Sequence, residues 1–341
     1  MLKFLKSYSL ADYNTFGFEA KANLLVEINS IQEFQELLAT AEWKNNQHLI
    51  LGGGSNILLT SDYGGLVVIN RISGNHILEE DDKSVLIKSG AGENWHQFVL
   101  YTLQNNWGGL ENLSLIPGTV GAAPMQNIGA YGVEIKDTFH SLEAINLNTG
   151  KVEVFTAEEC CFGYRESIFK HELKGQYFIA SVSFRLDKPG FHKLNLDYGV
   201  IKAVLAEKNI ERPSIQDVSD AVIEIRKSKL PDPAEIGNSG SFFKNPIIDL
   251  PEFEKLKREF PEIPFYELED GTIKLAAGWL IEKAGWKGYA ENGVGVHEKQ
   301  ALVLVNYGEG KGKDILKLAK KIQDSVHSKF GVELSPEVNF I

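Results

Sequence analysis

Cysteine is nearly absent from this 341-residue chain, because its only two cysteines are the adjacent residues Cys160 and Cys161. Neighbouring cysteines do not form an ordinary structural disulfide, so the sequence excludes a disulfide-stabilised scaffold and fits a reducing compartment. The cysteines and the eight histidines show no metal-ligand spacing, and we therefore expect no metal site.

Long hydrophobic runs are also missing. No apolar stretch approaches the ~20 residues that a membrane-spanning helix needs. The first ten residues lack the apolar h-region and the small-residue cleavage site of a signal peptide. We expect a cytoplasmic protein that has no membrane partner.

Basic residues are in deficit, with 35 Lys and Arg against 46 Asp and Glu and a formal net charge of −11. This balance argues against nucleic-acid binding, which normally requires a basic surface. It would also repel an anionic substrate, so any such substrate needs cations gathered locally. The length and the hydrophobic content of 43% allow two or three domains with substantial cores.

Glycine is concentrated in two loops. The longer loop, residues 116–132, contains four glycines and two prolines and is almost uncharged, and the shorter loop places three glycines after the strand-like run 49–51. Exposed N–H groups in such loops can cradle phosphates, and neither loop matches the dinucleotide or P-loop fingerprint. We predict that they bind a large phosphate-bearing ligand through Gly52, Gly53, Gly54, Ser55, Asn56, Pro117, Gly118, Gly121, Gln126, Asn127, Gly129, Ala130, Tyr131 and Gly132.

Together the two loops resemble those of the UDP-N-acetylenolpyruvoylglucosamine reductases, flavoenzymes that complete UDP-N-acetylmuramate synthesis for peptidoglycan. Further blocks follow in the order of the family and run nearly end to end. They lie at 162–167, 225–233, 240–246, 274–281, 297–304 and 335–338. A tyrosine at position 198 corresponds to the longer of the two family subtypes.

The resemblance implies an α+β fold, with a two-part FAD-binding region of the vanillyl-alcohol-oxidase/PCMH type and a smaller C-terminal substrate-binding domain. It places the parts at 1–70, 71–212 and 213–341. The residues independently favour α+β, because the strands do not alternate regularly with long helices. A change of composition marks a candidate boundary near 190–235.

The hydrophobic periodicity predicts the individual elements. Strands are expected at 24–28, 48–51, 66–70, 85–89, 139–146, 151–155, 177–186 and 301–306. Helices are expected at 31–40, 93–106, 157–161, 199–208, 215–228, 251–260, 272–284 and 313–330. Ser30 begins the first helix with a capping box, and Gly331 ends the last one.

The reaction implied by the resemblance uses FAD, bound without a covalent link, and NADPH as the reductant. The flavin reduces the enol ether of UDP-N-acetylglucosamine-enolpyruvate, after which a proton must reach the carbon left with negative charge. Arg165 matches the position that stabilises the enolate, and Ser241 matches the proton donor. Glu337 matches the third catalytic residue, with an orienting or hydrogen-bonding role.

Substrate binding is implied at further positions, namely Tyr164, Tyr198, Lys229, Asn245 and Gln300. Lys229 belongs to the densest basic cluster of the middle of the chain, with Arg226 and Lys227. One or two of these cations would also fit an ordinary solvated helix face. Ser335 and Asn339 depart from the common family pattern, which affects the surroundings of Glu337 more than Glu337 itself.

Two other functions remain open at this point. An FAD-linked oxidase or dehydrogenase of the same fold would not need the set Arg165, Ser241 and Glu337. A non-catalytic nucleotide-sugar-binding protein would be expected to have lost residues of that set, and this chain retains all three. We expect a monomer whose partners are the small molecules UDP-N-acetylglucosamine-enolpyruvate and NADPH.

Overall fold

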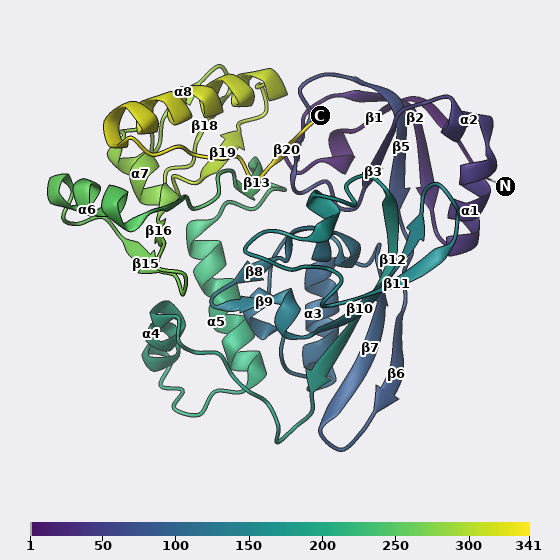
Figure 1. The fold of residues 1–341 in the computed structure, drawn as a ribbon, viewed down its shortest axis with the longest axis horizontal. Coiled ribbons are helices and arrows are strands. Elements are labelled where there is room, and N and C mark those ends of the chain that lie inside the picture. The colour runs from purple at the N-terminus through teal and green to yellow at the C-terminus, as the bar shows by residue number, and fades with distance from the viewer. Residues whose placement is uncertain (1) are drawn as a thin grey trace. The chain divides into compact units, whose positions relative to one another are not determined.

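The computed structural model describes residues 2–341, which form two compact units. The first unit comprises the residues up to Tyr8, Ala22–Gly53 and Gly64–Ser228. The second comprises Ser9–Lys21, Gly54–Tyr63 and Lys229–Ile341, so it collects two short N-terminal segments as well as the last third of the chain (Figure 1).

A four-stranded sheet in the order β1-β2-β5-β3 begins the first unit. Its strands are β1 (Leu5–Ser9), β2 (Lys21–Ile28), β5 (Tyr63–Asn70) and β3 (His48–Leu51), accompanied by helices α1 (Ile31–Ala39) and α2 (Ala41–Lys44). The predicted N-cap at Ser30 is confirmed, because its Oγ accepts the Glu33 N–H at 3.1 Å. The reciprocal bond of a capping box is shifted by one residue, since the Glu33 carboxylate accepts the N–H of Asn29 at 2.7 Å. Phe34 of α1 stacks on Phe178 with 3.9 Å between the ring centroids.

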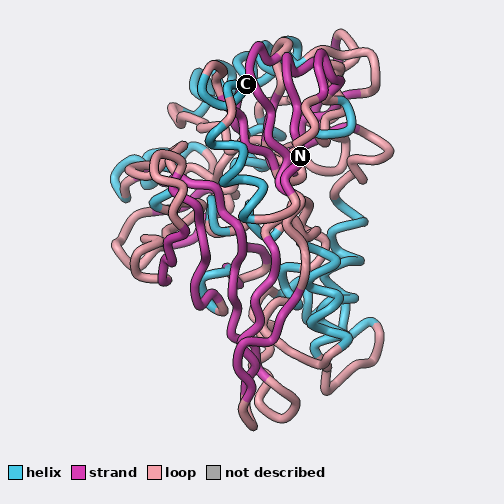
Figure 2. The backbone as a smooth tube through the Cα atoms, turned by 90° about the vertical axis from the view of Figure 1, so that its right-hand side faces the viewer, coloured by secondary structure: helices cyan, strands magenta, loops and turns pink. Residues whose placement is uncertain are grey.

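A five-stranded antiparallel sheet in the order β11-β10-β12-β7-β6 forms the larger part of the unit (Figure 2). The strands are β11 (Val152–Thr156), β10 (Phe139–Asn146), β12 (Tyr177–Asp187), β7 (Ser84–Gly90) and β6 (Asn75–Glu80). Helix α3 (Trp95–Gln104) packs on this sheet, since Trp95 and Phe98 both contact the ring of Phe184 from β12. These buried rings fix the N-terminus of α3, beside which the longer glycine loop runs.

Short elements make up the longer glycine loop and the segments around it. They are η2 (Glu111–Leu113), η3 (Val120–Ala122), η4 (Pro124–Gln126), β8 (Gly129–Ala130), β9 (Val133–Glu134), η5 (Ile135–Asp137) and η6 (Ile168–Lys170). Two helices then complete the unit, α4 (Gly199–Glu207) and α5 (Ile215–Lys229).

The second unit contains a sheet in the order β13-β19-β18-β17, a sheet in the order β14-β16-β15 and the parallel pair β20-β4. Its strands are β4 (Ile57–Leu58), β13 (Gly237–Ser241), β14 (Ile247–Ile248), β15 (Phe265–Glu267), β16 (Ile273–Leu275), β17 (Ala290–Glu291), β18 (Val294–Val296), β19 (Val303–Asn306) and β20 (Asn339–Phe340). Its helices are η1 (Ala11–Tyr13), α6 (Leu250–Glu259), α7 (Ala277–Lys283) and α8 (Gly312–Phe330). The prediction for α8 is confirmed, including the left-handed Gly331 (φ 72°) that ends it.

Two helix predictions were wrong. Residues 157–161 form hydrogen-bonded turns, because Cys161 adopts a left-handed conformation with φ 47° and prevents a helix from continuing. The helix expected at 272–284 starts only at Ala277, since Ile273–Leu275 pairs as a strand with both β14 and β15. Most of the short strands of the second unit were not predicted.

The mixed α+β fold class is confirmed, whereas the three-part division at 70 and 212 stays a prediction. No helix between residues 2 and 341 is long and apolar enough to span a membrane.

Candidate active site

The two glycine loops approach each other within the first unit. A Cβ at Gly52 would overlap Thr119 Oγ1, and one at Gly53 would lie 3.0 Å from the Gly118 Cα. Backbone therefore packs on backbone here, and any larger residue at Gly52 would displace Thr119. The Thr119 hydroxyl is buried and has no hydrogen-bond partner among the described residues.

The longer glycine loop is fixed to the start of α3. The Trp95 N–H donates to the Gly118 carbonyl at 3.0 Å, and the N–H groups of Val120 and Gly121 donate to Glu93 and Ala91, each at 2.9 Å. These bonds hold the loop at the N-terminal end of the helix, where partial positive charge favours an anion. The loop is thus ordered by its own backbone and does not require a lysine.

Asn127 braces the same loop from within. It adopts a left-handed conformation with φ 43° and is fully buried. Its Nδ2 donates to the Glu134 carboxylate at 2.9 Å and to the Gly163 carbonyl at 3.0 Å, while its Oδ1 accepts the Lys136 N–H at 3.2 Å. Both polar atoms of the side chain therefore form hydrogen bonds within the protein, and a role for Asn127 toward a cofactor stays a prediction.

Cations gather beside this loop. The Arg165 guanidinium donates to the carbonyl oxygens of Gly129 and Asn127. Arg226 lies nearby, donates to the Leu115 carbonyl at 3.3 Å and is hydrogen-bonded to Tyr131. Burial lowers the pKa of Arg226, Tyr131 raises it, and the charge of Arg165 lowers it further.

His96 lies at the edge of the same positive region. Its Nδ1 accepts the Leu115 N–H at 3.0 Å. Burial lowers the pKa of His96, and the charges of Arg226 and Lys227 lower it further. The imidazole is consequently neutral near pH 7 and adds no positive charge of its own.

The predicted tyrosines also lie in this region of the first unit. The Tyr164 ring centroid lies 5.5 Å from the Arg165 Cζ. Tyr198, directly before α4 and 42% exposed, contacts the ring of Tyr131 edge-on at 5.5 Å. Lys229 is the exposed last residue of α5, the helix that also carries Arg226.

The second unit brings Ser241 and Glu337 close together although 96 positions separate them. Phe243 forms an antiparallel bridge with Pro336. On either side, the Glu337 N–H donates to the Phe242 carbonyl at 2.8 Å and the Lys244 N–H donates to the Ser335 carbonyl at 2.9 Å. Ser241, exposed at the end of β13, is thus one residue from the position that pairs with Glu337.

Asn56 of the shorter glycine loop joins this pairing. Its Nδ2 donates to the Glu337 carbonyl at 3.3 Å, and its own carbonyl accepts the N–H and the Nδ2 of Asn339 at 3.1 and 3.0 Å. A residue at which the sequence departs from the family pattern therefore stabilises the segment that carries Glu337.

Two predicted substrate residues, Asn245 and Gln300, also belong to the second unit. Asn245 accepts the Ala277 N–H at 3.0 Å through its Oδ1 and so caps the start of α7. Gln300 Oε1 accepts the Leu302 N–H at 3.3 Å, directly before the strand that pairs with Ser241. The second unit thus gathers Ser241, Asn245, Gln300 and Glu337, whereas Arg165 and the tyrosines belong to the first unit.

Two residues of this region were missed as site candidates. Thr119 lies inside the loop that the sequence singled out, but nothing in the sequence indicates that its hydroxyl is buried and unpaired. Arg226 was noted only as part of a basic cluster. Arg226 follows the buried Val222 by four residues, so both lie on the same face of α5. That spacing was the available signal that the arginine is buried.

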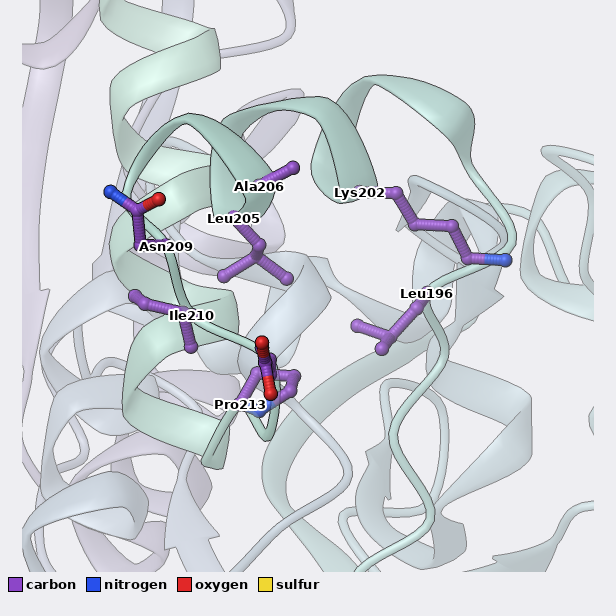
Figure 3. Close-up of a pocket in the computed structure, with 8 residues that line it drawn as sticks. Leu196, Lys202, Leu205, Ala206, Asn209, Ile210 and Pro213 are labelled. Carbon is purple, nitrogen blue, oxygen red and sulfur yellow. The ribbon is translucent and has the colours of Figure 1, made fainter.

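A hollow of about 390 Å³ lies elsewhere in the first unit, between α4 and the chain that follows it (Figure 3). Leu205, Ile210 and Pro213 form its aliphatic wall, and Lys202 extends away from them. None of the predicted site residues lines it. In residues 2–341, no three His, Cys, Asp or Glu side chains are arranged to hold a metal ion.

Comparisons with known proteins identify the family. Residues 232–341 match the description "UDP-N-acetylenolpyruvoylglucosamine reductase, C-terminal domain", and residues 22–156 match "FAD binding domain". The reductase of this name from Flavobacterium johnsoniae is 54% identical over 335 residues, which cover 98% of each chain. The chain belongs to the UDP-N-acetylenolpyruvoylglucosamine reductase family.

Other members of the family agree. The reductase from Pseudomonas syringae is 48% identical over 338 residues and covers 99% of both chains. The crystal structure of the Thermus caldophilus reductase has the same fold, with a TM-score of 0.67, 23% identity and coverage of 100% of this chain and 98% of that one. The protein is accordingly a flavin-dependent oxidoreductase with FAD as its cofactor.

The residues of the first unit fit FAD. The cofactor carries two phosphates, and the loops offer a glycine backbone at Gly52 and Gly53 together with the buried, unpaired Thr119 hydroxyl. A hydroxyl with no partner inside the protein costs free energy unless a ligand or water accepts its hydrogen bond. A phosphate oxygen would be such an acceptor.

We predict that Thr119→Val weakens FAD binding. A hydrogen bond to a charged group contributes about 1.5–3 kcal/mol, so the dissociation constant should rise by about 10-fold or more. Fluorescence titration of the FAD-depleted protein measures it. Thr102→Val is the matched control, because its equally buried hydroxyl donates to the Val99 carbonyl at 2.8 Å within α3. Unchanged affinity in Thr119→Val would exclude this hydroxyl from the FAD site.

Proposed function

We propose that the protein reduces UDP-N-acetylglucosamine-enolpyruvate to UDP-N-acetylmuramate, with NADPH as the reductant, in the synthesis of peptidoglycan precursors. The observation that carries this proposal is the 54% identity to a named reductase over 98% of the chain. The buried, unpaired Thr119 hydroxyl between the glycine loops supports the cofactor that such a reaction needs.

When bound, FAD supplies the hydride chemistry, taking a hydride from NADPH and delivering one to the enolpyruvyl group. The protein must then stabilise the negative charge that develops on the neighbouring carbon and carboxylate. Arg165 would bind that carboxylate, because its guanidinium is permanently charged and planar. Its hydrogen bonds to the carbonyl oxygens of Gly129 and Asn127 hold the guanidinium in place before the charge forms.

Ser241 would then donate the proton that completes the reduction. A serine hydroxyl is a weak acid, so the alkoxide that forms needs hydrogen-bond donors or cations close by. Glu337 belongs to the segment that pairs beside Ser241, and a carboxylate there would repel the enolate. We therefore assign Glu337 an orienting role, as a protonated or hydrogen-bonding group.

The diphosphate and sugar of the substrate need further contacts. We assign Lys229 to the diphosphate, because the net charge of −11 makes a local cation necessary. Tyr198 would close over the substrate from its exposed position, and Tyr164, Asn245 and Gln300 would add contacts. Asn245 uses its Oδ1 to cap α7, which leaves its Nδ2 for this role.

Several coarser features belong to the same proposal. The enzyme acts on small molecules, and we propose that it does so as a monomer in the cytoplasm. The parts 1–70 and 71–212 would together hold FAD, and 213–341 would bind the nucleotide sugar.

An anaerobic visible spectrum tests the reaction. The flavin bands should bleach when NADPH is added and return when UDP-N-acetylglucosamine-enolpyruvate follows. Recovery with oxygen alone would instead favour an FAD-linked oxidase, and bleaching without any recovery would favour a binding protein. A preparation that takes up no flavin after reconstitution would contradict the assignment of the glycine loops.

Ser241→Ala should separate the two half-reactions. Reduction of the flavin by NADPH should proceed normally, because it needs no proton from Ser241. Substrate-dependent reoxidation should slow by about 10²–10⁴-fold, the range of a lost general acid. Stopped-flow absorbance follows both steps, and equal slowing of both would contradict the assigned role.

Lys229→Ala should weaken binding of UDP without altering the flavin spectrum. Loss of a charge-assisted hydrogen bond of about 1.5–3 kcal/mol raises the dissociation constant about 10-fold or more. Isothermal titration measures it, with Lys320→Ala on the exposed face of α8 as the control for a lost surface charge. An affinity equal to that of the unmodified enzyme would remove Lys229 from the diphosphate site.

A further inference from the structure

Asn238 is a buried amide, the second residue of β13 and only 2% exposed, and no role has been assigned to it above. All of its side-chain hydrogen bonds go to nearby backbone groups. Its Nδ2 donates to the carbonyls of Ile236 at 2.8 Å and Pro231 at 3.2 Å, and its Oδ1 accepts the Gly240 N–H at 2.9 Å. One side chain thereby joins the turn after Lys229 to the residue that precedes Ser241.

The hydrogen bond to Gly240 matters because little else restrains that residue. Gly240 is left-handed with φ 71°, and a Cβ placed there would meet no heavy atom within 4 Å. Packing therefore does not impose its conformation, and a glycine in open space has wide backbone freedom. An asparagine that binds the N–H two residues later closes a turn of defined geometry.

The strand pairing points to the same place. Asn238 pairs with Val305 and Ser241 with Val303 of β19, and the register shifts between these two pairs. Ser239 and Gly240 therefore form an irregular step between two fixed positions. The Asn238 side chain bonds to the N–H of Gly240 across this step. It therefore restrains the backbone conformation directly before Ser241.

We propose that Asn238 is a positioning residue for Ser241, holding the Gly240 turn so that the serine hydroxyl occupies one position for proton delivery. This inference rests on the proposed function, in which Ser241 is the proton donor. The amide is suited to the task because it offers an acceptor to Gly240 and donors to two carbonyls at the same time. Asn238 acts through the backbone and does not touch the substrate.

Asn238→Ala should slow substrate-dependent flavin reoxidation by about 10-fold to 100-fold, the effect of a misplaced catalytic group. Reduction by NADPH should stay normal. Asn238→Ser, whose hydroxyl can accept the Gly240 N–H more weakly, should lose less than Asn238→Ala. Stopped-flow measurements on the FAD-loaded enzyme give both rates.

The matched control is Asn306→Ala. Asn306 is a similarly buried amide on β19 that donates to the Phe16 carbonyl at 2.8 Å and accepts the N–H groups of Gly308 and Gly310. Its loss should lower thermal stability and leave both half-reactions normal. If Asn306→Ala slows reoxidation as much as Asn238→Ala does, the effect is general destabilisation and the inference is overturned.

Two further measurements separate positioning from a purely structural role. In a Ser241→Ala background, Asn238→Ala should add no further loss, because residues that act as one unit are not additive. Amide hydrogen exchange at Gly240, measured by NMR without substrate, should accelerate in Asn238→Ala. A full additional loss, or unchanged exchange at Gly240, would contradict the proposal.

The remaining outcomes are also decisive. If Asn238→Ala gives no FAD-loaded protein, Asn238→Ser is compared with the unmodified enzyme, and equal reoxidation rates overturn the inference. If the unmodified enzyme itself shows no substrate-dependent reoxidation, the proposed function fails and the inference fails with it. Normal reoxidation in the unmodified enzyme and in Asn238→Ala overturns the inference alone.

Discussion

The first unit depends on a close approach of two backbone loops. Gly52 and Gly53 lie against Thr119 and Gly118 with no room for a side chain between them. The Trp95 N–H holds the Gly118 carbonyl at 3.0 Å and thereby connects this contact to the start of α3. Because α3 is itself anchored by buried aromatic rings, the hydrophobic core determines where the glycine backbone presents its N–H groups.

The second unit solves a different problem, which is to bring residues distant in the chain together. A single backbone hydrogen bond contributes only about 1 kcal/mol, so the bonds between the Ser241 and Glu337 segments do not hold them alone. Phe242, Phe243 and Val338 are all buried within these segments and supply the hydrophobic part. Asn56 then adds contacts from the shorter glycine loop. The buried apolar residues of the two segments therefore position the polar residues Ser241 and Glu337 beside them.

The sequence predicted the elements whose signals are local. Strands 48–51 and 139–146 have the predicted bounds, α1 begins at the expected cap Ser30, and α8 ends at the expected glycine, Gly331. The short strands β14–β18 were missed because segments of two or three residues carry no clear periodicity and form strands only when a distant partner is present. The helix expected at 272–284 failed for the same reason, since pairing with β14 and β15 overrides the local preference of its first residues.

The candidate site shows the same division. Its residue types could be recognised because glycine loops, an arginine and a serine occur in a characteristic order. Their hydrogen bonds could not be predicted. Asn127 was expected to face a ligand, yet its side chain forms hydrogen bonds with Glu134, Gly163 and Lys136. Conversely, the buried, unpaired hydroxyl of Thr119 lies against Gly52, which is 67 positions earlier in the chain, and no local pattern encodes that approach.

The two arginines beside the longer glycine loop bear on the binding of an anionic ligand. Arg165 and Arg226 lie close enough for one positive charge to lower the pKa of the other, in a chain whose net charge is −11. Holding like charges together in a buried region costs free energy, and the hydrogen bond that the Arg226 guanidinium donates to the Tyr131 hydroxyl oxygen offsets part of that cost. An anion that enters the region relieves the repulsion, and a ligand that binds only the folded state raises its stability. The same like-charge repulsion that costs folding free energy in this region therefore favours an anionic ligand, and it gives an acidic protein a local means of binding one.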